Sequence, residues 1–489
     1  MRRTLLVLSA AALAIPASAV TAQYASRALD PRLVAEAQRD NAEIVDEYGG
    51  AESGPRAAYV ASVGQRVAAF SGIQSAASVY HFTLLNSAVE NAFSVPGGYI
   101  YVTRQLMGLM DDEAELAFAL GHEVGHVAAG HAQQRERAEK RAVREQLPWI
   151  LLGNVFGGNF GSAVAARGLL TAELKTLSFS REQEYEADTL GLRYLVAAGY
   201  DPSGGPDILA ALARNQALQA RLQGVENRSL PEWASTHPLS ENRRQQAAAQ
   251  VRASGRLGTG IRNRNAFLDR LDGMYVDDDP KQGVIDGRTF THPDLRIQFT
   301  VPVGYLMDNG SRSVSIAGSA GKAEFGGGRF DGTLENYIYQ IVQAVADGQR
   351  VPVPPPRRTT INGIPVAYSV TRARGASGYV DLGVVAYQWA PGTVYHVVTM
   401  TSAGAGFGAF ASLVNSVRKI GPAEAAAIRP RIIDVVSVKP GDTVQSLSER
   451  MAYRDFKVDR FMSLNGLSSG ERLQPGQKVK LVVYGPRAA

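Results

Sequence analysis

The 489-residue chain contains no cysteine. A cysteine nucleophile, a zinc site built from thiolates and a disulfide scaffold are therefore excluded, and a chain of this length can bury adequate cores without disulfides. Charge of one sign is not in large excess either, since 51 basic and 46 acidic residues give a net charge of +5. The basic residues are dispersed and form no stripe interleaved with aromatic residues, so we expect no nucleic-acid partner.

Histidine is also scarce, with seven residues in the chain, and two of them lie in one short motif. His122 and His126 are four residues apart, so on a helix both imidazoles lie on one face and can reach one metal ion. Glu123 projects toward the open position of such an ion, where it can take a proton from water. The alternative is an amphipathic helix with two solvated histidines. The motif favours a zinc peptidase.

The residues around this motif are typical of a long helix. Acidic residues within 111–115 suit a helix N-terminus, and apolar residues follow at helical spacing. Gly121 and Gly125 make the helix narrow, which predicts close packing against another element. We expect the helix to continue through His131 into the charged stretch that follows. His131 comes five residues after His126, so we expect it to point away from the metal and to have no catalytic role.

A zinc site needs a third protein ligand, and an acidic segment further along the chain offers candidates. Glu184 and Asp188 are four residues apart and would share a helix face. One of them can bind the metal while the other accepts a hydrogen bond from a metal-bound imidazole. Glu182 and Glu186 are further candidates. Spacing alone does not choose among the four acids, because acidic helix faces are usually just solvated.

The H-E-x-x-H motif, followed by S-R-x-x-E-x-E-A-D at 180–188, resembles the HtpX/BepA-like zinc metallopeptidases. These enzymes form metallopeptidase family forty-eight, a family of gluzincins related to the CAAX prenyl endopeptidases. The resemblance implies one Zn²⁺ per chain with Glu184 as its third ligand. It also implies that Asp188 supports the site through one of the ligands, and that Glu123 is the general base for zinc-bound water.

A second stretch, at 91–95, is similar to a strand of this family. In the family that strand holds the substrate backbone in extended form at the active site. It precedes a Pro-Gly-Gly turn and the aromatic and β-branched residues at 99–103. Strand addition gives affinity through main-chain hydrogen bonds with little side-chain selectivity, as a protease of unfolded chains requires. Taken alone, the stretch is equally well an ordinary strand after a turn. The implied substrate-binding residues are Asn91, Ala92, Phe93, Ser94 and Val95.

A third stretch, T-H-P-x-x-x-x-R at 236–243, is similar to a segment of the BepA-like members. The resemblance implies a catalytic role for His237, which either occupies the open zinc position in a latent state or hydrogen-bonds the reaction's oxyanion. It gives Arg243 a role in supporting the site.

The tripeptide Thr-His-Pro recurs at 291–293, where we expect a turn that leads into a strand, since proline disfavours helix before it. The strand-like surroundings of the histidines at 81 and 396 predict structural roles.

The N-terminal residues are typical of a cleaved signal peptide at 1–22, with two arginines, an apolar run and small residues before the cleavage point. We therefore expect an exported, periplasmic protein, with an anchored N-terminus as the alternative.

The uncharged segment at 147–166 is long enough to span a bilayer, but its glycines, asparagines and proline disfavour a membrane span. The resemblance to the soluble BepA-like members implies a helical hairpin over the active site here. Peripheral contact with the membrane is the first alternative, and a membrane span is the second.

Length predicts about three domains after the signal peptide. The expected fold is multidomain, beginning with a mainly α (α+β) gluzincin metallopeptidase at 23–253 and a connector at 254–288. An α+β module of unknown role at 289–420 follows, with strand-like runs at 295–301 and 393–400 and helical spacing at 334–346. Residues 434–484 are similar to a LysM domain, a β-α-α-β fold whose family members bind N-acetylglucosamine in peptidoglycan. Gln445 departs from the bulky apolar residue that is common at its position.

These features predict an exported zinc-dependent endopeptidase that hydrolyses misfolded or stalled cell-envelope proteins. Peptidoglycan and the outer membrane are its further expected partners, through the LysM-like domain and the segment at 147–166. A peptidoglycan hydrolase is one alternative, although the chain lacks the H-x-H common in such enzymes. A non-enzymatic chaperone that binds the cell wall is another, but the intact zinc motif argues against it.

Overall fold

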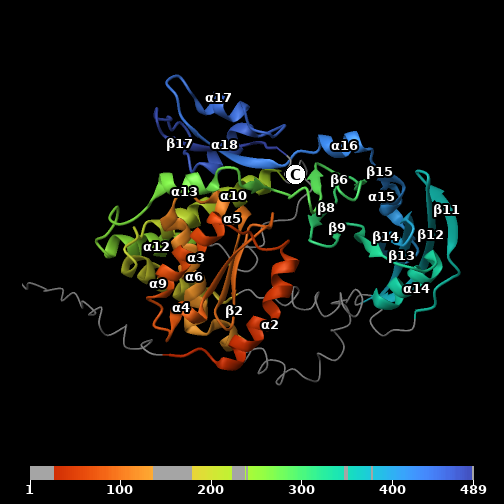
Figure 1. Ribbon diagram of the computed structural model, residues 1–489, viewed down its shortest axis with the longest axis horizontal. Helices are drawn as coiled ribbons and strands as arrows, with labels where there is room; N and C mark the ends of the chain where they lie inside the picture. Colours follow the sequence, from red (N-terminus) through yellow and green to blue (C-terminus); the bar gives the residue numbers. More distant parts are fainter. Residues whose placement is uncertain are drawn as a thin grey trace, which may run out of the picture.

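The computed structural model describes residues 27–135, 179–222, 237, 241–345, 351–375 and 378–486. The expected signal peptide at 1–22 and the expected hairpin at 147–166 lie outside the described residues. Within the described ranges, no helix is both long and apolar enough to cross a membrane. Figure 1 shows a helix-rich body, a β-rich body beside it, and a small C-terminal body on top of the helix-rich one.

The helix-rich body contains a three-stranded sheet with the order β1-β3-β2. Strand β1 (His81–Leu85) is parallel to β3 (Tyr99–Thr103), and β2 (Ala92–Val95) is antiparallel to β3 at one edge. Alternate residues of the strands face opposite sides, so one side packs against α2 (Pro31–Glu47) and the other joins the main core. The other helices of this body are α3 (Pro55–Ala68), α4 (Ala76–Val79), α5 (Arg104–Leu109), α6 (Glu113–Ala129), α9 (Arg181–Ala197), α10 (Gly204–Leu222), α12 (Glu241–Ala253) and α13 (Arg264–Leu271).

Helix α6 carries the H-E-x-x-H motif and is buried along its whole length. Asp112 begins it by accepting hydrogen bonds from the backbone N–H groups of Ala114 and Glu115, at 2.9 and 3.1 Å. Gly130 ends it with a φ of 70°, a left-handed conformation that glycine adopts without strain. The prediction that the helix continues through His131 is therefore wrong. The left-handed residue redirects the chain, and a new helical segment begins at His131.

Helices α6 and α9 approach each other closely. A Cβ atom on Gly125 would lie 3.2 Å from the carbonyl oxygen of Ala187, and one on Gly191 would lie 3.1 Å from the backbone nitrogen of His122. The close packing predicted from the glycines of α6 is thus confirmed, with Gly191 on α9 as a counterpart. Side chains that project from both helices consequently meet in one small volume.

The β-rich body contains two antiparallel sheets, with the orders β15-β7-β6-β5 and β11-β12-β13-β14-β10-β9-β8. Helix α14 (Leu334–Val345) covers one face of the larger sheet, and an aromatic-rich core fills the other. His292 is the last residue of β6, and the proline of the second Thr-His-Pro tripeptide begins the turn at 293–296 that leads into β7. The other elements are β5 (Val284–Asp286), β6 (Thr289–His292), β7 (Ile297–Thr300), β8 (Leu306–Asn309), β9 (Val314–Gly318), β10 (Gly321–Arg329), β11 (Arg357–Ile361), β12 (Ile364–Gly375), β13 (Gly378–Ala390), β14 (Thr393–Ser402), η1 (Gly408–Phe410), α15 (Ala411–Ser416), β15 (Arg418–Lys419) and α16 (Pro422–Ala427).

The C-terminal body consists of β16 (Arg431–Ser437), α17 (Val444–Glu449), α18 (Lys457–Leu464) and β17 (Lys478–Tyr484). Its two strands are antiparallel, and the short strand β4 (Tyr275–Val276) pairs with β16 as a third strand. Strand β4 lies before the β-rich body in the sequence, so the C-terminal sheet is completed by a distant segment.

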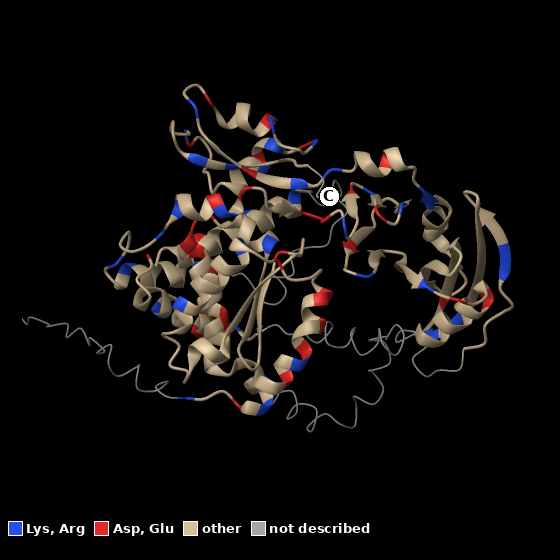
Figure 2. Ribbon diagram, viewed as in Figure 1, with Lys and Arg blue, Asp and Glu red and all other residues tan. Residues whose placement is uncertain are grey.

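The C-terminal body shares one hydrophobic core with the helix-rich body rather than hanging from it by a linker. Lys480 of β17 is fully buried, and its ammonium donates to the backbone carbonyls of Gly108 and Met110 at 3.1 and 2.6 Å. The carboxylate of Asp111 lies 3.3 Å from the same ammonium. Away from this junction, Figure 2 shows basic and acidic residues interspersed over all three bodies, in agreement with the dispersed charge of the sequence.

Candidate metal centre

Helices α6 and α9 bring four potential metal ligands together. The ligand atoms of His122, His126, Glu184 and His237 all lie within 4.8 Å of one another, and all four side chains are buried. Two histidines come from adjacent turns of α6 and the glutamate from the facing turn of α9. Glu184 and Asp188 are buried on this face, whereas Glu182 and Glu186 are exposed. Burial thus distinguishes among the four acids where spacing did not.

The distances within this group fit a zinc ion. Ligand atoms at the corners of a tetrahedron about 2.0–2.1 Å from Zn²⁺ lie about 3.3–3.4 Å apart. The Nε2 atoms of His122 and His126 are 3.0 Å apart, and the Glu184 carboxylate oxygens lie 3.6 and 3.4 Å from them. Imidazole nitrogens with one carboxylate are a donor set that zinc prefers. The centre therefore fits one Zn²⁺.

His237 fills the fourth corner of this tetrahedron. Its Nδ1 atom lies 2.9 Å from a carboxylate oxygen of Glu184 and 3.3 Å from Nε2 of His122. Its other ring nitrogen lies 3.4 Å from the carboxylate of Glu123. In a catalytic zinc site the fourth position belongs to water or substrate. The described arrangement is thus closed by a protein side chain.

Residues around the ligands fix their orientation. Nδ1 of His122 is 3.0 Å from the carboxylate of Asp188, which leaves Nε2 of that ring for the metal. Arg243 from α12 donates to both carboxylate oxygens of Asp188 at 2.8 Å and lies 2.6 Å from Glu184. One guanidinium therefore contacts both a potential ligand, Glu184, and the partner of a second one, Asp188.

We expect no catalytic role for His131, and it lies outside the group of potential ligands. However, its Nδ1 atom lies 2.9 Å from Nδ1 of His126, and its Nε2 atom lies 3.3 Å from the carboxylate of Glu186. With Nε2 of His126 directed to the metal, the proton on Nδ1 of that ring points to His131. His131 and Glu186 thus support His126 as Asp188 supports His122.

Phe179 makes a further contact that could not be predicted from the sequence. Its ring stacks on the imidazole of His126 with the ring centres 3.9 Å apart, and it lies 5.7 Å from the ring of His237. A lone phenylalanine before a helix carries no pattern by which it could be found. His131 could have been found by recognising Gly130 as a helix terminator.

The charge states of His126 and Glu184 suit metal binding. Burial disfavours the charged form of His126 and holds its pKa well below the ordinary value. Burial opposes ionisation of Glu184 too, but His237 and the α6 histidines more than compensate and hold the pKa of this carboxyl well below its usual range. The same balance raises the pKa of His237, because Glu184 and Glu123 outweigh burial. A neutral imidazole and a carboxylate anion are the forms that bind a metal.

The segment expected to bind substrate forms β2 and the residue before it. Strand β2 is at the edge of its sheet, and the hydroxyl of Ser94 donates to the carboxylate of Glu123 at 2.9 Å. Phe93 and Val95 point to the α2 side and pack in the core, and Asn91 is buried, with backbone hydrogen bonds to Thr103. The strand therefore passes beside the predicted general base, with Ser94 as the residue that contacts it.

Comparison with known proteins agrees with this geometry. Residues 55–251 match peptidase family M48, and residues 436–482 match the LysM domain. A beta-barrel assembly-enhancing protease of Yersinia pestis is 30% identical over 190 residues, which cover 38% of this chain and 37% of that protein. The protein of the same name from Escherichia coli (strain K12) is 30% identical over 191 residues, with the same coverage of 38% and 37%. The mitochondrial metalloendopeptidase OMA1 of Arabidopsis thaliana is 30% identical over 160 residues, which cover 33% of this chain and 29% of that protein.

The matched part thus spans little more than a third of the length of the first two relatives, at 37% each. The family M48 match at 55–251 includes both helices of the metal centre, β2 and Arg243. The chain carries a peptidase family M48 domain followed by a C-terminal LysM domain.

Proposed function

We propose that this protein is an exported zinc-dependent endopeptidase that cleaves misfolded or stalled proteins of the cell envelope. The observation that carries the proposal is the tetrahedral group of His122, His126 and Glu184 with Glu123 beside it. The family match and the names of the relatives support the same activity. The expected export signal and the LysM domain support a periplasmic location near the cell wall.

The chain's own residues supply the remaining chemistry. A bound zinc ion would act as a Lewis acid and lower the pKa of a water molecule toward neutrality. Glu123 would take a proton from the attacking water as its oxygen adds to the peptide carbonyl, and would return that proton to the nitrogen that leaves when the C–N bond breaks, so no covalent intermediate with the protein is needed. Ser94 orients the Glu123 carboxylate through its 2.9 Å hydrogen bond. The free edge of β2 holds the substrate backbone in extended form.

His237 controls access to the metal in this proposal. Its Nδ1 atom stands where the attacking water belongs, which supports the latent state over an oxyanion role in the described conformation. Residue 237 must therefore move before water and substrate can enter. Once displaced, the same ring can hydrogen-bond the oxyanion, so the two expected roles need not compete.

The test is cleavage of casein by the zinc-loaded protein, its Glu123→Gln variant and its His237→Ala variant. His292→Ala is the matched control, because it removes the histidine of the other Thr-His-Pro tripeptide. We expect Glu123→Gln to retain zinc and lose cleavage, and His237→Ala to cleave faster than the intact protein. If no form cleaves casein although zinc is bound, the general-protease proposal is refuted.

The LysM domain adds a binding function to the proposal. We expect the protein to sediment with insoluble peptidoglycan, with the glycan as a partner rather than a substrate. Release of soluble muropeptides in the same assay would instead favour the peptidoglycan hydrolase alternative. Contact with the outer membrane depends on residues 147–166 and remains a prediction.

A further inference from the structure

The β-rich body contains a segment whose charges are mostly of one sign. Residues 346–417 carry five arginines, two aspartates and no lysine or glutamate, which is an excess of three positive charges. The whole chain has an excess of five. More than half of the net charge therefore lies in this segment, which includes β11 to β14. None of its described residues belongs to the metal centre.

Exposed residues of this segment gather at one end of the seven-stranded sheet. Arg374 of β12 is opposite Tyr379 of β13 in the register, and two residues further along Arg372 is opposite Asp381. Residues that are opposite each other, or two apart on one strand, face the same side of a sheet. Both arginines are exposed, and Tyr379 is 64% exposed. This end of the sheet thus presents cations beside an aromatic ring.

An uncharged loop closes the same end of the sheet. The loop at 403–409 follows β14, the strand next to β13, and consists only of alanine, glycine and phenylalanine. Asp381 fixes the loop by accepting hydrogen bonds from the backbone N–H groups of Gly404 and Gly406 at 2.8 and 2.9 Å. Residues 403–405 are exposed. A loop of fixed shape therefore presents an uncharged surface next to the arginines.

Ion pairing leaves this face of the sheet positive. The carboxylate of Asp381 lies 3.3 Å from Arg372, and these two charges offset each other. Arg357 of β11 is on the same face, opposite Tyr368 of β12. Among the residues that the structure describes, neither Arg357 nor Arg374 has an ion-pair partner, and both are exposed. Two positive charges thus remain on this face without a compensating carboxylate.

The opposite face of the sheet is closer to neutral. Arg358 of β11 forms a 2.6 Å ion pair with Glu335 of α14. Lys322 and Glu324 are two residues apart on β10 and face this side together. The excess of cations consequently belongs to the face that also carries Tyr379.

Cations, an exposed tyrosine and an uncharged loop together suit the surface of a membrane that contains anionic lipids. Each basic residue near such a surface strengthens binding about fivefold. A tyrosine ring is favoured at the level of the headgroups, where its hydroxyl stays in water. An uncharged loop can approach the headgroups without desolvating a charge. An acidic protein would engage the arginines alone, whereas a membrane surface engages all three features.

We propose that this end of the β-rich body binds the surface of a membrane that contains anionic lipids. The binding residues are Arg357, Arg372, Arg374, Tyr379 and the loop at 403–409, which we call the arginine face. The inference goes beyond the proposed endopeptidase function and does not depend on it. It is also separate from the membrane contact expected of residues 147–166.

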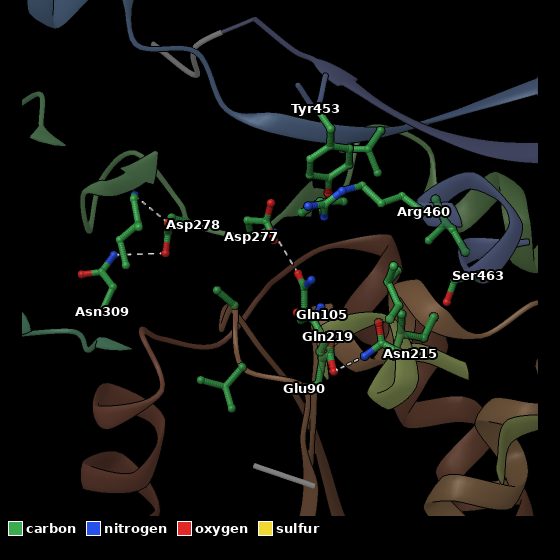
Figure 3. A pocket seen from close by; sticks show the side chains of 18 of the residues that line it. Glu90, Gln105, Asn215, Gln219, Asp277, Asp278, Asn309, Tyr453, Arg460 and Ser463 are labelled. Atoms are coloured by element: carbon green, nitrogen blue, oxygen red, sulfur yellow. Dashed lines mark hydrogen bonds between the residues drawn. The ribbon is translucent and has the colours of Figure 1, made fainter. Parts of the chain in front are cut away.

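Binding through the arginine face would orient the whole molecule. Figure 3 shows the place where the three bodies meet, with the amide of Asn309 donating to Asp278 at 3.2 Å and the backbone N–H of Asp277 donating to Gln105 of α5 at 2.9 Å. These contacts join the β-rich body to the helix-rich one. Figure 1 shows β11 to β13 on the side of the β-rich body away from α6 and α9. The metal centre would therefore stand away from the bilayer.

The experiment is co-sedimentation of the full chain with sucrose-loaded vesicles, which gives a partition coefficient. One set of vesicles is phosphatidylcholine alone, and the other contains about one-third phosphatidylglycerol. The test variant is Arg357→Gln/Arg374→Gln. The matched control is Arg252→Gln/Arg256→Gln, which removes two exposed arginines at the end of α12 and just beyond it. Both double variants have the same net charge.

We expect binding to the anionic vesicles that weakens at high salt, and much weaker binding to phosphatidylcholine. The test variant should lower the partition coefficient about 10- to 30-fold, and the control by less than about twofold. Tyr379→Ser should weaken binding at low and high salt alike, whereas Tyr484→Ser, at a residue that is 51% exposed in the LysM domain, should not. All variants retain residues 147–166, so any binding by that segment is common to them.

The absence of cysteine allows the contact to be located directly. Ala405→Cys and Leu257→Cys each provide one exposed site for an environment-sensitive fluorophore. We expect anionic vesicles to shift the emission to the blue at 405 and to leave it unchanged at 257, which lies in the helix-rich body. A fluorophore at 405 that stays in water would overturn the inference, as would a test variant that binds vesicles as well as the intact protein. If that variant instead loses sedimentation with peptidoglycan and keeps vesicle binding, the arginine face belongs to the wall and the membrane inference is equally refuted.

Discussion

Replacing Lys480 with methionine tests whether the LysM domain and the peptidase domain form one stable unit. The lysine acts as a cap for α5, because the carbonyls of Gly108 and Met110 lie at the C-terminal end of that helix and accept from its ammonium. Methionine preserves most of the stem volume and removes all three donors. Two buried carbonyls then lose this donor, and the carboxylate of Asp111 loses the closer of two cations, since the guanidinium of Arg264 lies 3.8 Å from it.

The expected cost follows from these contacts. Each buried acceptor left without a donor costs about 1–3 kcal/mol. Against this, the variant avoids the burial of an ammonium, whose cost is seen in the lowered pKa of Lys480. The net expectation is a loss of about 3 kcal/mol, near the lower end of values for removing one partner of a buried charge pair. Lys478→Met is the matched control, because its ion pair with the exposed Asp269 is worth at most about 1 kcal/mol.

Hydrogen exchange followed by mass spectrometry is the appropriate assay, since a multidomain chain need not unfold in one step. The segments that contain α5 and β17 should lose protection together in Lys480→Met and remain protected in Lys478→Met. The reasoning is refuted if β17 alone exchanges faster while α5 is unaffected, or if Lys480→Met changes the protection of both segments by less than about 0.5 kcal/mol.

Three further predictions concern residues away from this junction. His131→Phe should weaken zinc binding about 10- to 100-fold in competition with a chromophoric chelator, because His126 loses its supporting partner; unchanged affinity would contradict that role. Arg243→Lys should weaken zinc binding to a similar degree, since an ammonium cannot reproduce the fork to Asp188, whereas Arg244→Lys at the exposed neighbouring position should have no effect. Burial raises the pKa of Glu324 to about 7 in the folded protein from 4.5, so its contribution to stability is lost as pH rises from about 4.5 to about 7. Glu324→Gln should therefore stabilise the β-rich body against heat at pH 8, by up to about 3 kcal/mol, and have little effect at pH 4; equal effects at both pH values would show that charge is not the cause.

Local periodicity explains why much of the molecule could be predicted from the sequence. The two α6 histidines meet because their spacing matches one helical turn, and the helical pattern at 334–346 appears as α14 (Leu334–Val345). The run at 393–400 lies within β14. It could be predicted because strand formation there is indicated by β-branched and aromatic residues that are neighbours in the sequence. Choosing Glu184 among four acids needed the family resemblance, because burial depends on the helix that packs against it.

The parts that could not be predicted depend on contacts between distant segments. Lys480 occurs in an alternating stretch of β17, where a lysine ordinarily faces solvent, and only the docking of the LysM domain on α5 buries it. The contact between His131 and His126 could not be predicted from helical spacing, because the left-handed conformation of Gly130 ends the helix and turns the chain back toward His126. Pairing of β4 with β16 leaves no trace in either short sequence.

That pairing has a consequence for the architecture of the chain. Val276 and Arg431 are opposite each other in the register of β4 and β16, so the backbone departs for the β-rich body and returns from it at neighbouring points. The β-rich body is thus an insertion into a continuous peptidase–LysM unit rather than a spacer between two domains. A spacer sets the distance between the domains that it joins, whereas an insertion with adjacent ends does not. The length and sequence of the inserted body can therefore vary without changing how far the metal centre stands from the LysM domain.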